Sequence, residues 1–375
     1  MPERPVVAIL CDFPYWLVNN DLPAQGGHYA VWLLALHEAL RESDEFDIHW
    51  ITLTKVVSRV TRFSCANQHF HLIPRGSRII GLCSAYAVDR WRLARELKVI
   101  QPDLLHTWGT EDCYALAGTD FRGQKLLSMQ GVLTACLKRA RIPRFQQVQS
   151  LYEKYSVRFY QHITAESQWA ADRTKEIAPQ ADMQLFEYAP NEVFFRMKRM
   201  PSTTPTCFLA GTDTPVKNVA SAIRAFSRPE LAHVTLFMAG IEPANHPDIP
   251  GNIVALGRIS QVEIAEYLTS CWALIHPSLA DSCPNIVKEA RAMGIPAVVT
   301  TECGAKQYIL HGQSGYVIPP NDDEALVQAV LSMTQSQEDS LRMGAFDCER
   351  CREALSRQTM TRRLCELYRG LLAME

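Results

Sequence analysis

The sequence lacks the features of membrane-spanning, secreted and zinc-finger proteins. No apolar run approaches the roughly 20 residues that a membrane-spanning helix needs. The first residues, MPERPVVAIL, contain no hydrophobic signal core followed by a cleavage site, so we expect a cytoplasmic location. The 12 cysteines are scattered, and the single C-x-x-C, at Cys348 and Cys351, has no second pair to complete a zinc site. We therefore expect reduced thiols.

Several motifs of phosphate chemistry and of hydrolysis are also absent. The chain has no G-x-G-x-x-G fingerprint of nicotinamide or flavin enzymes and no Gly-Lys pair of a P-loop. It has no D-x-D pair of carboxylates for a Mg²⁺- or Mn²⁺-bound diphosphate and no G-x-S-x-G nucleophile elbow. The net charge of −2 leaves no basic footprint for nucleic acid, which we exclude as a partner. A bound diphosphate would therefore depend on backbone amides and on Lys or Arg.

The 375 residues alternate apolar strands with amphipathic helices, which predicts parallel sheets covered on both faces. Residues 6–11 are a continuous apolar run, typical of a central parallel strand. Around 190–205, prolines and a basic run predict a linker. The sequence thus predicts two doubly wound, Rossmann-like α/β domains, 1–197 and 198–355, that face a central cleft. Residues 356–375 predict a helix that packs back on the first domain.

The segment 276–300, HPSLADSCPNIVKEARAMGIPAVVT, is the densest in candidate functional residues. It predicts a strand, a polar loop with Asp281, a helix and another strand. Asn285, Ile286 and Val287 would form the first helical turn, where unpaired N–H groups and the helix dipole favour a diphosphate. Glu289 would accept hydrogen bonds from a ribose diol. In the alternative interpretation, Asp281 and Ser282 only cap the helix, and Glu289 is a solvated helix residue.

This segment resembles the signature of retaining glycosyltransferases of family 4, which have the GT-B fold. The family pattern is an acidic residue, seven others, Glu, then Ala-x-x-x-Gly-x-Pro. Here Asp281 and Glu289 are followed by Ala290, Gly294 and Pro296. The resemblance implies an enzyme that transfers a sugar from a nucleotide-diphosphate donor, such as a UDP- or GDP-sugar, to a saccharide, glycolipid or other hydroxyl acceptor. It implies retention of configuration, no metal and no cofactor.

Other family landmarks follow in order along the chain. Gly26 and Gly27 resemble the glycine loop beside the donor. Residues 102–110 resemble the fourth strand and its active-site loop. Residues 210–218, with Gly211, Thr212 and Lys217, resemble the phosphate loop. The landmark for the nucleotide base lies at 257–259 and includes Arg258 and Ile259.

Three positions depart from the family pattern. The first acid is commonly Glu, and Asp281 is one methylene shorter. Thr212 stands where the phosphate loop commonly has Arg, so Lys217 is left as the loop's cation. Trp108 stands where many members have His, two positions after His106.

The resemblance also implies the roles of the site residues. Lys217 and the amides of 285–287 would stabilise the leaving diphosphate, and Asp281 would hold hydroxyls of the donor sugar. His106 is a further catalytic candidate, with a buried histidine hydrogen-bonded to backbone as the alternative. The predicted donor-binding residues are Gly26, Gly27, Gly211, Thr212, Lys217, Arg258, Ile259, Asn285, Ile286, Val287 and Glu289.

Two other functions fit the same fold, and one segment suggests a surface. A nucleotide-sugar 2-epimerase would need an acid–base set in the cleft. A catalytically weak homologue would bind nucleotide without turnover, as the missing cation at Thr212 would allow. Residues 135–160 mix basic and apolar side chains, which predicts either a solvated basic face or a peripheral contact with the inner face of a membrane that carries a lipid-linked acceptor. The leading hypothesis is an enzyme of polysaccharide or glycolipid biosynthesis.

Overall fold

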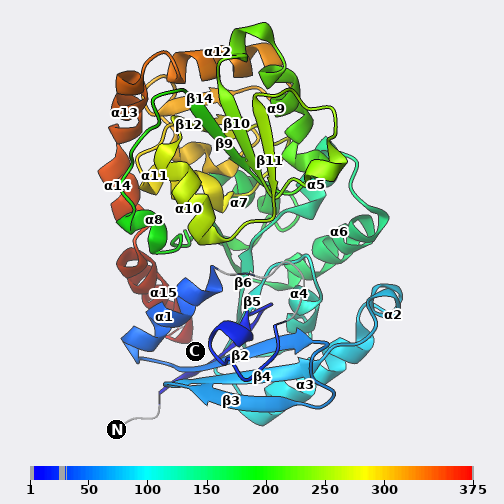
Figure 1. The fold of residues 1–375 in the computed structure, drawn as a ribbon. Helices are drawn as coiled ribbons and strands as arrows, with labels where there is room; N and C mark the ends of the chain where they lie inside the picture. Colours follow the sequence, from blue (N-terminus) through cyan, green and yellow to red (C-terminus); the bar gives the residue numbers. More distant parts are fainter. Residues whose placement is uncertain (1–3, 25–29, 31, 374–375) are drawn as a thin grey trace. The chain divides into compact units, whose positions relative to one another are not determined.

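A computed structural model of the chain describes residues 4–24, 30 and 32–373 (Figure 1). The contacts divide it into two compact units. Unit 1 comprises residues 1–137, 143–189 and 357–375, and unit 2 comprises residues 138–142 and 190–356. None of the helices in the described residues is long and apolar enough to cross a membrane. All twelve cysteines are free thiols.

Unit 1 contains an eight-stranded sheet with the order β3-β4-β2-β1-β5-β6-β7-β8. Neighbouring strands are parallel except for the antiparallel β3–β4 pair. The strands are β1 Val6–Leu10, β2 Asp47–Thr54, β3 Thr61–Cys65, β4 Gln68–Pro74, β5 Leu104–Trp108, β6 Gln124–Met129, β7 His162–Ala165 and β8 Asp182–Leu185.

Helices cover both faces of this sheet, which explains why β1 is apolar at every position. Val7 and Ile9 face one core cluster, and Ala8 and Leu10 face the other. The helices of this part are α1 Leu33–Ser43, α2 Arg78–Cys83, α3 Ala87–Ile100, α4 Tyr114–Gly118, α5 Leu133–Arg139, α6 Arg144–Ser156 and α7 Gln168–Lys175.

The last helix, α15 Arg357–Leu372, packs in unit 1. Its apolar stripe includes Leu364, Tyr368 and Leu371, which join the core cluster of β1 and α1. In Figure 1 this dark red helix lies beside the blue α1. The two ends of the described chain therefore complete one core.

Unit 2 contains a six-stranded, fully parallel sheet with the order β11-β10-β9-β12-β13-β14. The strands are β9 Thr206–Ala210, β10 Thr235–Ala239, β11 Ile253–Gly257, β12 Ala273–His276, β13 Ala297–Thr300 and β14 Gly315–Ile318. The helices are α8 Val193–Arg196, α9 Val219–Phe226, α10 Gln261–Ser270, α11 Asn285–Ala292, α12 Asp323–Met333, α13 Gln337–Ala345 and α14 Cys348–Ala354.

Numbered from β9, the strand order of unit 2 is 3-2-1-4-5-6, which is the Rossmann order. The order reverses between β9 and β12, so the loops after these two strands diverge and leave room for a ligand at the carboxyl edge. The prediction of two doubly wound α/β domains is confirmed. The central cleft between them stays a prediction.

Candidate functional site

The loops that follow β9 and β12 meet at the reversal point of the unit 2 sheet. The N–H of Leu279 donates to the carbonyl of Val216 at 2.7 Å, which joins the two loops directly. The side-chain amide of Asn218 donates to the carbonyl of Pro277 at 3.1 Å. Asn218 adopts a left-handed conformation with φ of 53°, which Asn tolerates better than most residues. These contacts fix the predicted phosphate loop, 210–218, against the loop that carries Asp281.

Lys217, His276 and Asp281 form the charged centre of this site. The Lys217 Nζ donates to Asp281 Oδ2 at 2.5 Å, and His276 Nε2 lies 2.9 Å from the same oxygen. The side chain of Asp281 is 12% exposed and that of His276 is 3% exposed. Neither bond uses Oδ1 of Asp281, and no hydrogen bond to this oxygen occurs among the residues that the structure describes, so a ligand could use it.

The site keeps Asp281 ionised. Burial by itself would raise the pKa of Asp281, but the Lys217 ammonium and the His276 ring lower it well below its ordinary value. Burial lowers the pKa of His276, and Asp281 offsets part of that shift. At neutral pH the centre therefore holds one carboxylate, one ammonium and a neutral imidazole.

Backbone hydrogen bonds on both sides fix the position of Asp281. Its N–H donates to the carbonyl of Glu302 at 3.1 Å, and its carbonyl accepts from the N–H of Gly304 at 2.8 Å. Asp281 forms an isolated parallel bridge with Cys303. The segment that follows β13 thus holds Asp281, which lies in the loop after β12. The sequence did not indicate this contact.

The helix α11 begins at Asn285, as the sequence predicts, and no side chain caps it. The cap interpretation is wrong for Asp281, whose side chain bonds instead to Lys217 and His276. Of the three amides predicted to bind a diphosphate, that of Val287 is already occupied. Its N–H donates to the carbonyl of Pro284 at 3.1 Å. Within the described part of the chain, the N–H groups of Asn285 and Ile286 have no acceptor.

The first residue of α11 offers one more unsatisfied group. The side-chain oxygen Oδ1 of Asn285 is buried and accepts no hydrogen bond from the residues that the structure describes. Buried polar atoms normally have a partner. A donor from a ligand, such as a hydroxyl group, would satisfy it.

Glu289 lies one turn further along α11 and is only 5% exposed. The alternative of a solvated helix residue is therefore wrong. Burial raises the pKa of Glu289 to about 7, and nearby Lys288 offsets part of the shift. No hydrogen bond to its carboxylate occurs among the described residues. A buried carboxyl group with two open acceptors suits a diol.

The remaining predicted donor residues of unit 2 lie on the same edge of the sheet. Gly211 follows β9, and a Cβ at this position would contact the Lys217 side chain at 3.7 Å. Thr212 is exposed, with its hydroxyl 3.4 Å from that of Thr214. Arg258 and Ile259 follow β11, two strands away from β9. Arg258 is exposed, and Ile259 packs against the core that includes α11.

Gly240 supports the phosphate loop from the neighbouring strand, and the sequence reasoning missed it. It follows β10 with φ of 80°, and a Cβ there would lie 2.1 Å from the carbonyl oxygen of Gly211. Only glycine fits this close approach without displacing the loop. In the sequence, Gly240 directly follows the largely apolar run 234–239, which is typical of a strand, and this position was the available signal.

His106 lies in unit 1, fully buried on β5. Its ring nitrogens are each 2.7 Å from a hydroxyl oxygen, of Tyr368 on α15 and of Ser128 on β6. Burial lowers its pKa to about 3, so it stays neutral. This placement favours the buried-histidine interpretation, although its partners are side chains rather than the expected backbone. Gly26 and Gly27 lie outside the described residues.

A second polar cluster, which the sequence did not indicate, lies at the carboxyl edge of the unit 1 sheet. Asp12 follows β1 and accepts a hydrogen bond from the Tyr114 hydroxyl at 2.8 Å. Arg75, after β4, forms an ion pair with Asp112, after β5. Burial and the neighbouring Asp112 raise the pKa of Asp12 to about 6, against the effects of Arg75 and Tyr114. Each acid follows a strand of the parallel sheet, which is the usual position of ligand-binding side chains.

Comparison with known proteins identifies the part of the chain that carries the first site. Residues 191–346 match the family described as glycosyl transferases group 1. The matched segment makes up most of unit 2. The matched residues include Lys217, Asp281 and all of α11. The prediction of a transferase of this family is confirmed at the level of the domain, whereas membership of family 4 stays a prediction.

Curated relatives match shorter parts of the chain. An exopolysaccharide phosphotransferase of Streptomyces coelicolor is 32% identical over 129 residues, which are 31% of this chain and 13% of that protein. The amylovoran biosynthesis glycosyltransferase AmsK of Erwinia amylovora is 30% identical over 98 residues, 24% of each chain. The chain thus matches no more than a quarter of the length of either relative.

Solved structures match the whole fold at low identity. A sucrose-phosphate synthase from Thermosynechococcus elongatus superposes with a TM-score of 0.82 at 15% identity, covering 100% of both chains. HepE of Anabaena in complex with UDP-glucose gives a TM-score of 0.70 at 13% identity, covering 97% of this chain and 99% of that one. The predicted GT-B type of fold, with two Rossmann-like domains, is confirmed.

Proposed function

We propose that this protein is a retaining, metal-independent glycosyltransferase that moves a sugar from a nucleotide-diphosphate donor to a hydroxyl acceptor. One observation carries the proposal. The ion pair of Lys217 and Asp281 lies at the reversal point of the glycosyl transferases group 1 domain, next in sequence to the uncapped start of α11. Cation, amides and an oriented carboxylate are the groups that donor cleavage needs.

The diphosphate would bind at Lys217 and the start of α11. The free N–H groups of Asn285 and Ile286 and the positive end of the helix dipole would hold phosphate oxygens. The Lys217 ammonium would balance the charge that develops as the nucleoside diphosphate departs. The two open oxygens of Glu289 would accept hydrogen bonds from the ribose diol.

The donor sugar would bind at Asp281. Its Oδ2 already holds Lys217 and His276, and its Oδ1 is free to accept a sugar hydroxyl. Because two backbone bonds fix Asp281, the sugar would be held in one orientation with its anomeric carbon toward the acceptor. The shorter side chain of Asp281, compared with the usual Glu, would set the sugar closer to the loop.

In the proposed reaction the acceptor oxygen forms a bond to the anomeric carbon, and the bond from that carbon to the diphosphate oxygen breaks. The acceptor proton passes to the departing phosphate oxygen, so the charges balance without a metal or a carboxylate nucleophile. Attack from the side of the leaving group retains the anomeric configuration. Lys217 and the two amides stabilise the departing anion throughout.

The acceptor would bind at the carboxyl edge of the unit 1 sheet. There Asp12, Arg75 and Asp112 form a partly buried polar cluster suited to sugar hydroxyls. HepE, of the same fold, was crystallised with UDP-glucose, and AmsK takes part in amylovoran biosynthesis. These relatives support a UDP-sugar donor and a saccharide or glycolipid acceptor as the first candidates to test.

A glycolipid acceptor is favoured by an exposed apolar and basic face on unit 1. The short helix α2 packs against α6, and Ile79, Ile80, Leu151 and Tyr155 on these helices are all more than half exposed. Arg78, at the start of α2, is exposed beside them. We propose that this face contacts the anionic inner leaflet of a membrane from the cytoplasmic side.

Liposome co-sedimentation tests the membrane contact. We expect the protein to sediment with vesicles of anionic lipid, and Leu151→Glu to reduce the bound fraction severalfold. Val254→Glu, an exposed apolar position in unit 2, serves as the matched control. Equal sedimentation with neutral and anionic vesicles would remove this part of the proposal.

The main proposal is tested by a screen of UDP- and GDP-sugars with thermal shift, followed by product analysis by NMR. A bound donor raises stability by mass action, and NMR of the product reports the anomeric configuration and the acceptor. An epimerised sugar nucleotide in the absence of acceptor would favour the 2-epimerase. Binding without turnover over a broad acceptor panel would favour the catalytically weak homologue.

A further inference from the structure

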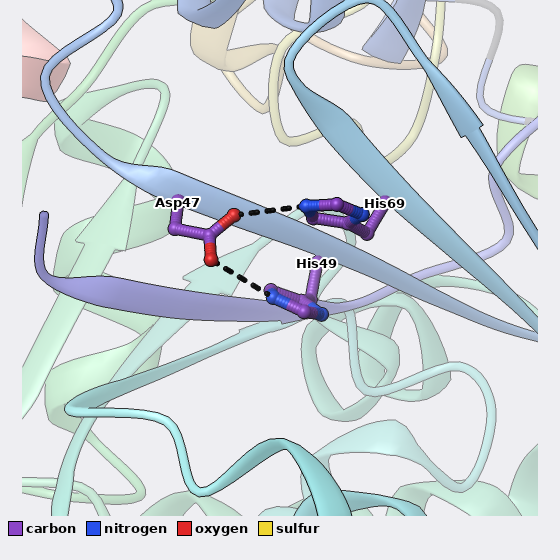
Figure 2. Close-up of side chains that lie close together, drawn as sticks. All are labelled: Asp47, His49 and His69. Carbon is purple, nitrogen blue, oxygen red and sulfur yellow. Dashed lines mark ion pairs between the residues drawn. The ribbon is translucent and has the colours of Figure 1, made fainter.

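Three ligand-type side chains meet at the amino-terminal ends of two paired strands in unit 1. Asp47 and His49 lie two residues apart on β2, so they project from the same face of the sheet. His69 on β4 is the register partner of His49. Figure 2 shows one carboxylate oxygen of Asp47 directed to each imidazole ring. This cluster is at the opposite end of the strands from the carboxyl edge where ligands of the fold bind.

The three side chains lie close enough together for one ligand atom of each to reach the same metal ion. The Nε2 of His49 lies 3.5 Å from one oxygen of Asp47, and the Nε2 of His69 lies 3.2 Å from the other. The three ligand atoms lie within 4.8 Å of one another. Bonds of roughly 2.0–2.1 Å from Zn²⁺ to nitrogen and oxygen place tetrahedral ligands about 3.3 Å apart.

A chain of polar contacts fixes the orientation of the His49 ring. Arg62 donates two bonds to Glu96, at 2.6 and 2.8 Å, so Glu96 is an ionised acceptor. His71 Nδ1 lies 2.6 Å from Glu96 and donates to it. The other ring nitrogen of His71, Nε2, lies 2.9 Å from Nδ1 of His49.

Both ring nitrogens of His49 therefore have a polar neighbour. Its Nδ1 faces Nε2 of His71, and its Nε2 faces the carboxylate of Asp47 at 3.5 Å. The contact at Nδ1 fixes the orientation of the ring, so that Nε2 is directed into the cluster.

His69 has the same arrangement on the other side of Asp47. Its Nδ1 lies 2.9 Å from the hydroxyl of Ser64 on β3, and its Nε2 faces Asp47. An outer hydrogen bond on the second ring nitrogen is the usual feature of metal-binding histidines. Both histidines thus present Nε2 inward and have Nδ1 held by a neighbouring side chain.

We propose that Asp47, His49 and His69 bind one Zn²⁺ ion, or a transition-metal ion of similar ligand preference. Two imidazoles and a carboxylate are the ligand types that Zn²⁺ takes, with water in the fourth position. The side chains of His49, Asp47 and His69 are 16%, 37% and 43% exposed, which leaves the ion a path from solvent. The ion would tie β2 to β4 and stabilise unit 1, separately from the proposed donor site in unit 2.

Isothermal titration of the full chain, without a histidine tag, with Zn²⁺ and with Mg²⁺ tests this site. We expect one Zn²⁺ per chain, no comparable binding of Mg²⁺, and a rise in the melting temperature of unit 1 with Zn²⁺. His69→Gln should weaken Zn²⁺ binding at least a hundredfold and abolish the thermal shift. Ser64→Ala, which removes an outer partner, should weaken it about tenfold.

Two further variants complete the test. Asp47→Asn removes a ligand at a partly exposed position, so it replaces His69→Gln if that variant fails to fold. His233→Gln, an exposed histidine in unit 2, is the matched control and should bind Zn²⁺ as the wild type does. If the wild type binds Zn²⁺ no more tightly than His69→Gln and Asp47→Asn, the cluster is an imidazolium–carboxylate ion pair and the proposal fails.

Discussion

The substitution Glu289→Gln should make this protein more stable and a poorer binder of nucleotide. Burial raises the pKa of Glu289 to about 7 from an ordinary 4.5. The native state therefore binds this proton more tightly than the unfolded state, and ionisation destabilises the fold as pH rises from 4.5 through 7. The rise of the pKa from 4.5 to about 7 corresponds to a penalty of ~3 kcal/mol at pH 8 and ~1 kcal/mol at pH 5.

Glutamine has the same shape and no charge, so Glu289→Gln removes this penalty. We expect the free energy of unfolding in urea to exceed that of the wild type by ~3 kcal/mol at pH 8 and by ~1 kcal/mol at pH 5. Glu353→Gln, on the exposed surface of α14, is the control and should change the free energy by less than about 0.5 kcal/mol at both pH values.

The affinity of Glu289→Gln for nucleotide should fall, although its stability rises. A hydrogen bond from the ribose diol to a carboxylate contributes about 1.5–3 kcal/mol, and Gln retains one acceptor oxygen of the two. Calorimetric titration with UDP and GDP should therefore show affinity about 10- to 100-fold lower for Glu289→Gln. A variant that is no more stable than the wild type at pH 8, or that binds nucleotide equally well, would refute the assigned role.

Three further substitutions test other parts of the site. Asp281→Asn removes a carboxylate with a lowered pKa, so it should cost ~1–3 kcal/mol in urea unfolding at pH 7, with a smaller difference as pH falls below 4. Gly240→Ala places a Cβ against Gly211 and should cost ~1–3 kcal/mol and weaken nucleotide binding, whereas Gly251→Ala, in open space, should not. His106→Leu should cost ~1–3 kcal/mol, because it leaves the buried Tyr368 hydroxyl without its partner, while the pH profile of kcat keeps its shape. A changed profile would restore a catalytic role.

The features that could be predicted from sequence are those set by neighbours along the chain. The apolar run of β1, the loop–helix–strand order around α11 and the spacing from Asp281 to Glu289 each depend on a few consecutive residues. Lys217 could be predicted as well, because it lies within the short segment 210–218 that resembles a phosphate loop.

The features that could not be predicted depend on residues brought together by strand pairing. The contact of His276 with Asp281 requires the fold of the loop after β12, and that of Gly240 with Gly211 requires the register of β9 with β10. Burial of Glu289 is set by the packing of α11, which no local pattern shows. The cluster at Asp47 likewise forms only when β2 pairs with β4.

The most direct test of the central claim is the rate at which nucleoside diphosphate is released from the donor, in the presence of acceptor, by the wild type and by Lys217→Met. Loss of the cation that we propose stabilises the departing diphosphate should lower kcat ~10²- to 10³-fold. Lys198→Met, at an exposed position in the same unit, should leave kcat unchanged. Equal release by the wild type and Lys217→Met would contradict the assignment of this site to sugar transfer.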